Sequence, residues 1–527
     1  MPIFGKRPPR TFPLLLSCVL AASTAACAPS AWAQTDSTLT TAQRLLKQAY
    51  TAARDAPLSQ NADAGQVIAA LRSSGDKDLL PFFQKLRQSK TVDNQIFGMV
   101  ASAILAKQSG MNPEQKEFTY VDTKLLFSSK DTALIGSAVA SLIDAQALST
   151  AQLKEVLAKA PDAAHRAMAA GELNRMKKLD DRAALLAMLK DDKEIVRYYS
   201  AVTLLTGTDA ERTAALSCMK DLTDAHDLRQ APIQALMLVR MQKENLPAGV
   251  PWAAQIAADE KCDEGLRYTA VATVLSFKAP EGATILADMI QKQKDSIQQV
   301  KLGLISTEYA GQLKPQVLAP LVNSKSALAK SIGTMAQKGA SGGDISADLL
   351  ALLKEGHPIV LDWALAYADR ADPERRLALR TALINQATIV DGIRDRDFER
   401  AAIAAQKILA DDGEPGRKIV SGFLKSENRA AVEATLAGIF RSDAKNQADL
   451  IPAAVWDGLT KTTSLENATN YAALILAREG RQEALVWLPG MVMGGTAQGA
   501  GFRALAGWYY AKMKGQIGKL LDVALAE

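Results

Sequence analysis

The chain has 527 residues, of which 48% are hydrophobic and 5% aromatic, so it carries enough aliphatic side chains to build a sizeable core. Its 62 lysines and arginines stand against 57 aspartates and glutamates, a formal net charge of +5, and the two signs are mixed along the sequence. This balance argues against a nucleic-acid-binding face, and no apolar run after residue 33 reaches the ~18 residues of a bilayer-spanning helix.

Residues 1–33 are predicted to be a signal peptide that directs export. The positive charges that open such a segment are present at Lys6, Arg7 and Arg10. Residues 12–22 form an apolar stretch too short to cross a bilayer, and the small residues Ala31 and Ala33 precede a cleavage site that would leave Gln34 as the new N-terminus. The sequence therefore predicts a periplasmic or secreted protein.

Cys27 leaves a second processing route open. Ala25 and Ala26 precede it, as in a lipoprotein box, although Thr24 stands where such boxes prefer a branched apolar residue. Lipidation of Cys27 would make the protein a membrane-anchored lipoprotein instead.

The rest of the chain is predicted to be helical throughout, because apolar residues recur at helical spacing and no alternating β-branched run is present. The clearest helix pair joins Asp181–Lys190 to Lys193–Leu205, with Asp191 and Asp192 in the turn expected to cap the second helix. The predicted regions are a lead-in and capping helix (34–75), regular helix pairs (76–310), less regular pairs of the same array (311–480) and a glycine-rich loop with capping helices (481–527).

Short segments within the regular region are copies of one another. Three of them align without gaps, at residues 196–205, 228–237 and 266–275. Their shared arginine, with a weaker copy upstream, occupies Arg166, Arg197, Arg229 and Arg267. Helix pairs with a period of roughly 30 to 45 residues indicate an α-solenoid, and we expect one right-handed superhelix of about thirteen pairs.

An acidic turn residue precedes each of these arginines, at Asp162, Asp192, Asp224 and Asp263. In this pattern the chain resembles bacterial HEAT-repeat proteins, most clearly between about residues 150 and 280. The resemblance implies a curved stack whose second helices line a concave interaction surface. We expect the aspartates and arginines to form a structural ladder of charge-assisted hydrogen bonds, with an anionic-ligand site as the alternative.

Cleavage after Ala33 would leave Cys218 and Cys262 as the remaining cysteines. In an exported protein they could form one disulfide between neighbouring repeats. The alternative is two separate buried thiols.

Chemistry-bearing motifs are sparse. His165, His226 and His357 fit no metal-ligand spacing, and neither a nucleophile elbow nor a phosphate-binding loop occurs, so we expect no catalytic residue, metal or cofactor. The glycine-rich segment 489–501 precedes an aromatic cluster, Trp508, Tyr509 and Tyr510. This cluster is expected to cover the last core layer, with a localised binding region as the alternative.

These observations favour a non-catalytic scaffold in the bacterial envelope that binds a protein or peptide on its concave helical surface. One alternative is a cell-wall enzyme of the lytic transglycosylase type, but the Glu-Ser dipeptide of that family is absent and Ser426-Glu427 has the reverse order. The other alternative is a purely structural spacer.

Overall fold

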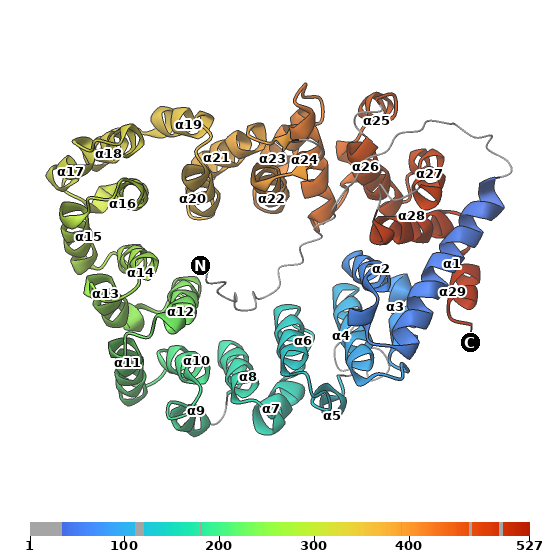
Figure 1. The fold of residues 1–527 in the computed structure, drawn as a ribbon, viewed down its shortest axis with the longest axis horizontal. Coiled ribbons are helices and arrows are strands. Elements are labelled where there is room, and N and C mark those ends of the chain that lie inside the picture. Colours follow the sequence, from blue (N-terminus) through green and yellow to red (C-terminus); the bar gives the residue numbers. More distant parts are fainter. Residues whose placement is uncertain are drawn as a thin grey trace, which may run out of the picture. The chain divides into compact units, whose positions relative to one another are not determined.

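The computed structural model describes residues 34–110, 121–179, 182–390, 393–462, 466–494 and 499–526. The predicted signal peptide, including Cys27, lies outside the described residues. The chain divides into two compact units (Figure 1). Unit 1 takes in the chain up to His165, Asp391–Ile393 and the chain from Lys445 onward, and unit 2 consists of Arg166–Val390 and Arg394–Ala444.

Unit 1 is built from helices at both ends of the sequence. Its helices are α1 (Gln34–Asp55), α2 (Ala62–Ser73), α3 (Leu80–Leu86), α4 (Val92–Gln108), α5 (Thr123–Leu126), α6 (Thr132–Asp144), α7 (Thr150–Lys159), α25 (Ala453–Thr460), α26 (Glu466–Arg478), α27 (Leu488–Met493), α28 (Ala500–Met513) and α29 (Ile517–Ala524). Short 3-10 helices join them at η1 (Leu58–Gln60), η2 (Lys77–Leu79), η7 (Ala448–Leu450) and η9 (Gln482–Val486).

Unit 2 is a run of helix pairs. Its helices are α8 (Ala163–Arg175, mostly in this unit), α9 (Ala183–Met188), α10 (Glu194–Leu204), α11 (Asp209–Asp224), α12 (Ala231–Lys243), α13 (Val250–Ala258), α14 (Glu264–Ser276), α15 (Pro280–Lys292), α16 (Ser296–Glu308), α17 (Ala319–Val322), α18 (Ala327–Ala340), α19 (Ser346–Lys354), α20 (Pro358–Ala368), α21 (Pro373–Asn385), α22 (Arg396–Asp411), α23 (Gly413–Phe423) and α24 (Arg429–Arg441). The 3-10 helices are η3 (Leu228–Gln230), η4 (Pro247–Gly249), η5 (Ala310–Gln312) and η6 (Pro315–Leu318). Two two-residue strands, β1 (Ile389–Val390) and β2 (Ile393–Arg394), pair between α21 and α22.

The helix pairs of unit 2 form two layers. Helices α9, α11, α13 and α15 make one layer, and α10, α12, α14 and α16 make the other, on the concave side of the unit (Figure 1). Side-chain caps start these helices: Thr208 and Glu211 form a capping box at α11, and Asp263 accepts from the N–H of Leu266 at α14. This arrangement is the all-α superhelix of HEAT-like helix pairs that the sequence predicts.

Several helices end on a left-handed residue other than glycine. Gln146, Lys177, Asn245 and Lys278 have positive φ angles. At Asn245, for example, the N–H of Leu246 donates to the carbonyl of Met241, which closes the helix end in a Schellman motif. The same local turn therefore ends α6, α8, α12 and α14.

In unit 1 the first helices pack on the last ones. α28 lies against α1 and α2, and two of its glycines permit the approach: a Cβ at Gly507 would lie 2.6 Å from that of Ala42, and one at Gly501 would lie 2.9 Å from that of Ala70. The indole N–H of Trp508 donates to Asp76 over 2.9 Å, and the ammonium of Lys512 pairs with the same carboxylate at 2.7 Å. These contacts hold the two ends of the sequence together within the unit.

The predicted helices agree closely with those observed in the regular region. The structure gives α4 and α10 within a residue of the expected bounds. The expected cap of α10 is wrong: its N-cap is Lys193, whose side chain accepts no capping hydrogen bond, while Asp192 is exposed and Asp191 accepts from the N–H of Lys193 before the helix. Within the described part of the chain, no helix combines the length and the apolarity that crossing a bilayer would require.

Candidate interaction surface

An exposed apolar stripe runs along η3 and α12 on the concave side of unit 2. Leu228, Leu236 and Val239 are 65%, 46% and 53% exposed, and Pro232 is exposed between them. Within α12, Pro232, Leu236 and Val239 are four and then three residues apart and so lie on one helix face, and Leu228 precedes them in η3. We call Leu228, Pro232, Leu236 and Val239 the α12 stripe.

The opposite face of α12 is fixed to α10. Met237, Leu238 and Met241 are fully buried. The amide of Gln234 donates to the hydroxyl of Tyr198 over 2.7 Å, and burial raises the pKa of Tyr198 to about 12. The helix therefore cannot turn its apolar stripe inward without breaking a buried hydrogen bond.

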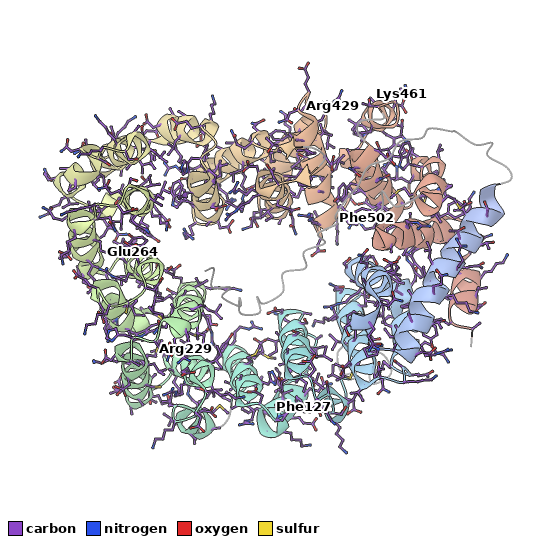
Figure 2. All side chains as sticks on the ribbon, in the orientation of Figure 1. Phe127, Arg229, Glu264, Arg429, Lys461 and Phe502 are labelled. Atoms are coloured by element: carbon purple, nitrogen blue, oxygen red, sulfur yellow. The ribbon has the colours of Figure 1, made fainter. Side chains whose placement is uncertain are left out.

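The flanks of α12 are held in the same way. The guanidinium of Arg240 lies over the ring of Tyr199, 5.4 Å from its centroid, and pairs with Glu244 at 2.7 Å. On the other flank, Gln242 donates to the hydroxyl of Thr273 on α14 over 2.8 Å. Figure 2 labels Arg229 just before α12 and Glu264 at the start of α14.

A rigid helix with one apolar strip and polar flanks suits recognition of a macromolecule better than it suits catalysis. Single exposed apolar residues are ordinary on a protein surface, whereas a continuous apolar strip is typical of an interaction site. The aliphatic strip can bury apolar side chains of a partner, and the fixed backbone lowers the entropy cost of binding.

At Arg197, Arg229 and Arg267 the structure does not show the predicted pairing with the turn aspartates. Arg197 is half-buried and forms no ion pair with any described residue. Arg267 donates instead to the carbonyl of Ala257 near the end of α13, over 3.1 Å. Asp263 serves as the N-cap of α14, and Asp192 is exposed.

Arg229 also takes a different partner from the one predicted. It pairs with Asp227 at 2.6 Å, whereas Asp224, at the end of α11, pairs with Lys220. The cause is local: η3 delays the start of α12, so Arg229 lies in the turn before the helix. Arg197 and Arg267 each occupy the fourth position of their helices.

In the weaker upstream copy of the repeat, the arginine occupies the same position in its helix. Arg166 is the fourth residue of α8 and is half-buried. Asp162 accepts from the N–H of Ala164 over 2.8 Å, which is the interaction of a turn residue at a helix start.

Cys218 and Cys262 are both free and half-buried, so the structure favours two separate thiols over the predicted disulfide. The thiol of Cys218 lies 3.5 Å from the carbonyl of Leu189. Burial raises the pKa of both thiols, and the nearby Asp259 raises that of Cys262 further. Neither is therefore an activated nucleophile.

We expect the mature chain, starting at Gln34, to show two reactive thiols after unfolding without reductant. In the native state both should react with a disulfide reagent at pH 8 severalfold more slowly than free cysteine, because a raised pKa lowers the thiolate fraction. The absorbance of the thiolate that the reagent releases measures the reaction rate of both cysteines. Fewer than two thiols in the unfolded chain would show that a bridge forms.

His226 has a carboxylate partner rather than a metal environment. Its ring nitrogen lies 2.7 Å from Asp259, whose pKa is held below its usual range by the N–H of Lys261 and by this imidazole. Across the described ranges, no group of three or more His, Cys, Asp or Glu side chains is arranged to hold a metal ion.

The aromatic cluster of α28 is part of the core. Trp508, Tyr509 and Tyr510 are each at most 2% exposed, where they cover the N-terminal helices of unit 1. The alternative, a binding region on these rings, does not fit such complete burial.

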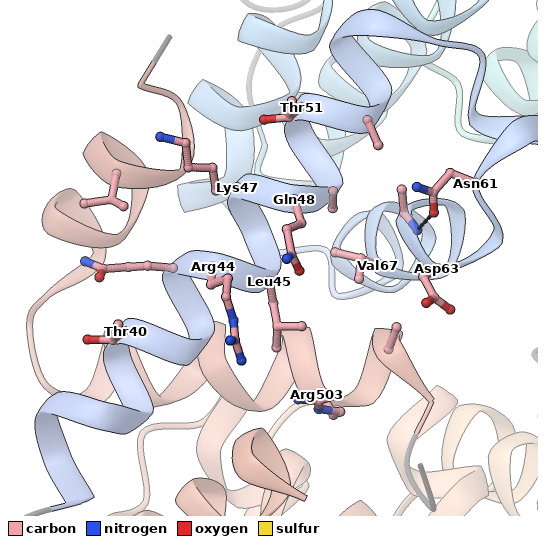
Figure 3. A pocket seen from close by; sticks show the side chains of 16 residues that line it. Thr40, Arg44, Leu45, Lys47, Gln48, Thr51, Asn61, Asp63, Val67 and Arg503 are labelled. Carbon is pink, nitrogen blue, oxygen red and sulfur yellow. Dashed lines mark hydrogen bonds between the residues drawn. The ribbon is translucent and has the colours of Figure 1, made fainter. Parts of the chain in front are cut away.

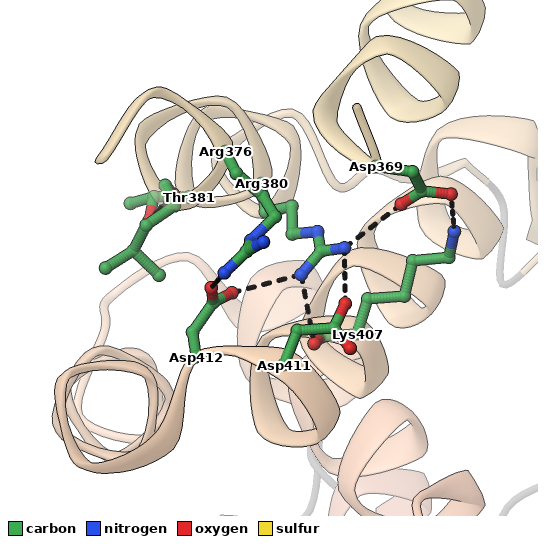
Figure 4. A network of polar contacts seen from close by, with 8 residues as sticks. Asp369, Arg376, Arg380, Thr381, Lys407, Asp411 and Asp412 are labelled. Carbon is green, nitrogen blue, oxygen red and sulfur yellow. Dashed lines mark hydrogen bonds and ion pairs between the residues drawn. The ribbon is translucent and has the colours of Figure 1, made fainter. Parts of the chain in front are cut away.

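A buried ionic network in unit 2 was not predicted from the sequence (Figure 4). The side chain of Arg380 on α21 is 1% exposed and contacts three carboxylates: Asp369 at 3.0 Å, Asp411 at 2.7 Å and Asp412 at 3.0 Å. Arg376 shares Asp412, and Lys407 shares Asp369. The paired carboxylates at 411 and 412 thus join α21 to the end of α22, a structural role.

Comparison with known proteins finds only weak likenesses. No family model matches the chain, and no curated protein does. Solved structures of Kap121p alone, bound to Ste12p and bound to Nup53p are similar to 93%, 94% and 93% of this chain, at 13%, 11% and 12% identity and TM-scores of 0.32, 0.35 and 0.34. The chain spans 58% to 59% of the length of Kap121p. A likeness this low carries no argument.

The helices themselves define the class of protein. Successive helix pairs stacked in two layers, with second helices along one side, make the chain an α-solenoid of HEAT-like repeats.

Proposed function

We propose that this chain is a non-catalytic scaffold of the bacterial envelope that binds a protein or peptide partner along the concave helical surface of unit 2. The α12 stripe is the observation that carries the proposal. A purely structural spacer would have no reason to keep three apolar side chains exposed on one face of α12 and a fourth, Leu228, exposed in the turn before it.

The chemistry of the described side chains supports a binding role. Both cysteines have raised pKa values, and the imidazole of His226 is engaged by Asp259. The acidic pair at 411 and 412 is engaged by Arg376 and Arg380. In unit 2, therefore, both thiols are held protonated, and the imidazole of His226 and the acidic pair have structural partners.

The proposed location rests on the sequence of residues 1–33. A positive start, the apolar stretch 12–22 and the small residues Ala31 and Ala33 together support export. Cleavage after Ala33 would leave α1, which begins at Gln34, intact. Lipidation of Cys27 would place the same surface at a membrane.

A photo-crosslinking residue in place of Leu236, in the chain expressed with its own leader, tests the partner site. We expect adducts of one defined mass from position 236, because the stripe lies in the proposed contact. The matched control is position 186, since Leu186 is also an exposed leucine, 37% exposed, but lies on α9 in the other layer. Equal adducts from both positions, or none from position 236, would contradict the proposal.

A second experiment places the crosslinker at position 239 and measures the yield of the same adduct. Leu236→Asp is expected to lower that yield at least tenfold, because a charge on the stripe must be desolvated on binding. Leu186→Asp should leave the yield unchanged. Circular dichroism should show the same melting curve for both variants, since both positions are exposed. An unchanged yield with Leu236→Asp would show that the stripe is not part of the interface.

A further inference from the structure

A second concave site lies in unit 1, where the N-terminal helices meet the C-terminal ones. An open groove of about 940 Å³ is bordered by α1, the start of α2, α28 and α29 (Figure 3). Its volume lies in the upper range of ligand sites, and its open form suits a chain segment better than a small molecule that must be enclosed. All of these borders belong to one unit.

The groove carries positive charge that the described residues do not neutralise. Arg44 is exposed on α1 and forms no ion pair with any described residue. Arg503, on α28, donates through Nε to the carbonyl of Val492 over 3.1 Å, which leaves the outer nitrogens of its guanidinium available. Figure 3 shows Arg44 directed from α1 towards α28, where Arg503 lies. Two guanidinium groups on facing helices favour carboxylates, which they can bind bidentately.

The remaining charges do not reverse this balance. Lys47 adds a third cation on the rim, and Asp63 is the only acidic residue among those lining the groove in the described chain. Asp63 stands in the first turn of α2, where the unpaired amides of the helix start stabilise a carboxylate. Charge complementarity therefore selects an acidic occupant.

The floor of the groove is apolar. Leu45 is half-buried, Val67 is buried and Val523 is 38% exposed. An occupant thus meets aliphatic surface between basic groups, which fits a peptide with alternating acidic and aliphatic side chains. A membrane surface or a nucleic acid would call for a larger basic cluster than three residues.

The walls of the groove are fixed before any ligand arrives. The amide of Gln43 donates to the carbonyl of Lys519 over 3.2 Å, which ties α1 to α29. Gly507 lets α28 approach Ala42 on α1. A preformed site loses less entropy on binding than one that must be ordered.

We propose that this groove binds an acidic peptide segment, whose carboxylates pair with Arg44 and Arg503 and whose aliphatic side chains lie on Leu45 and Val67. The site is separate from the α12 stripe and goes beyond the proposed scaffold function. It gives the chain a second binding surface with a different chemical preference.

Fluorescence polarisation with the chain from Gln34 onward tests the proposal. The probe is a fluorescein-labelled ten-residue peptide with four glutamates and two leucines, and the matched probe has glutamine in place of each glutamate. We expect the glutamate peptide to bind at least tenfold more tightly, with an affinity that falls as salt rises. Equal affinity of the two peptides would overturn the proposal.

Variants then locate the binding site. Arg44→Gln and Arg503→Gln should each weaken binding of the glutamate peptide at least fivefold, whereas Lys461→Gln, which removes an exposed positive charge elsewhere in unit 1, should not. Leu236→Asp should leave this binding unchanged, so failure of the groove and failure of the α12 stripe are distinguishable. Affinity for phosphatidylglycerol vesicles that depends on Arg44 and Arg503, without affinity for the peptide, would overturn the peptide assignment.

Discussion

Arg380→Met is expected to destabilise the α20–α22 region of unit 2 by about 3 kcal/mol. The guanidinium is 1% exposed and joins three carboxylates, of which Asp412 is itself only 3% exposed (Figure 4). Methionine fills a similar volume but leaves buried negative charge with fewer partners. Breaking a buried ion pair from one side typically costs about 3 to 5 kcal/mol.

The lower end of that range applies because two cations remain. Arg376 still lies 2.7 Å from Asp412, and Lys407 still pairs with Asp369. Asp411 loses its contact with Arg380, but it is 46% exposed and can be solvated. The cost is therefore concentrated at Asp412.

Hydrogen exchange measured by mass spectrometry on peptides from α20, α21 and α22 gives the readout. A loss of about 3 kcal/mol corresponds to a more than hundredfold increase in the opening equilibrium. Arg229→Met is the matched control, since Arg229 also pairs with an aspartate but its side chain is 90% exposed, and we expect no measurable change there. A similar, small effect from both variants would show that the network contributes no more than a surface pair.

The helices themselves could be predicted because their signals are local. The bounds of α4 follow from apolar spacing within a few turns, and the capping box of Ser149 and Gln152 marks the start of α7. A glycine usually marks the left-handed residue that ends a helix. The turns that end α12 and α14 could not be predicted in this way, because Asn245 and Lys278 occupy that position.

The α12 stripe could not be predicted from the repeat alignment. That alignment places Leu236 opposite Leu204, which is fully buried, whereas Leu236 is 46% exposed. Other aligned positions agree, because Gln234 and Met237 are buried like their counterparts Val202 and Leu205. The alignment therefore predicts the packed side of α12 and misses the exposure of the side that carries Leu236.

The polar sites could not be predicted from the sequence because their residues are far apart along the chain. Arg44 and Arg503 line one groove only because unit 1 brings both ends of the chain together. Arg380 and the carboxylates at 411 and 412 lie on different helices, and nothing local shows that Arg380 is buried. The arginines at 376 and 380, one helical turn apart, are the one hint of a shared acidic partner.

Trp508→Ala is expected to destabilise unit 1 by about 3 to 5 kcal/mol, and to expose helices at both ends of the chain. Trp508 is fully buried on α28, which packs on α1 and α2. Its truncation opens a cavity and leaves Asp76, 7% exposed, without the indole N–H that it accepts over 2.9 Å. Lys512 still neutralises Asp76, so most of the cost comes from the cavity.

The region that loses protection from hydrogen exchange tests whether α28 stabilises the N-terminal helices. Peptides from α2 should exchange at least a hundredfold faster in the Trp508→Ala chain, although α2 lies more than four hundred residues before the substitution. Trp252→Ala is the matched control, because Trp252 is 2% exposed in unit 2 and donates to Thr223 over 2.8 Å, so its loss should affect α11 and α13 but not α2. Unchanged exchange of α2 with Trp508→Ala would mean that the N-terminal helices hold without α28, and that the groove containing Arg44 does not depend on the C-terminal helix.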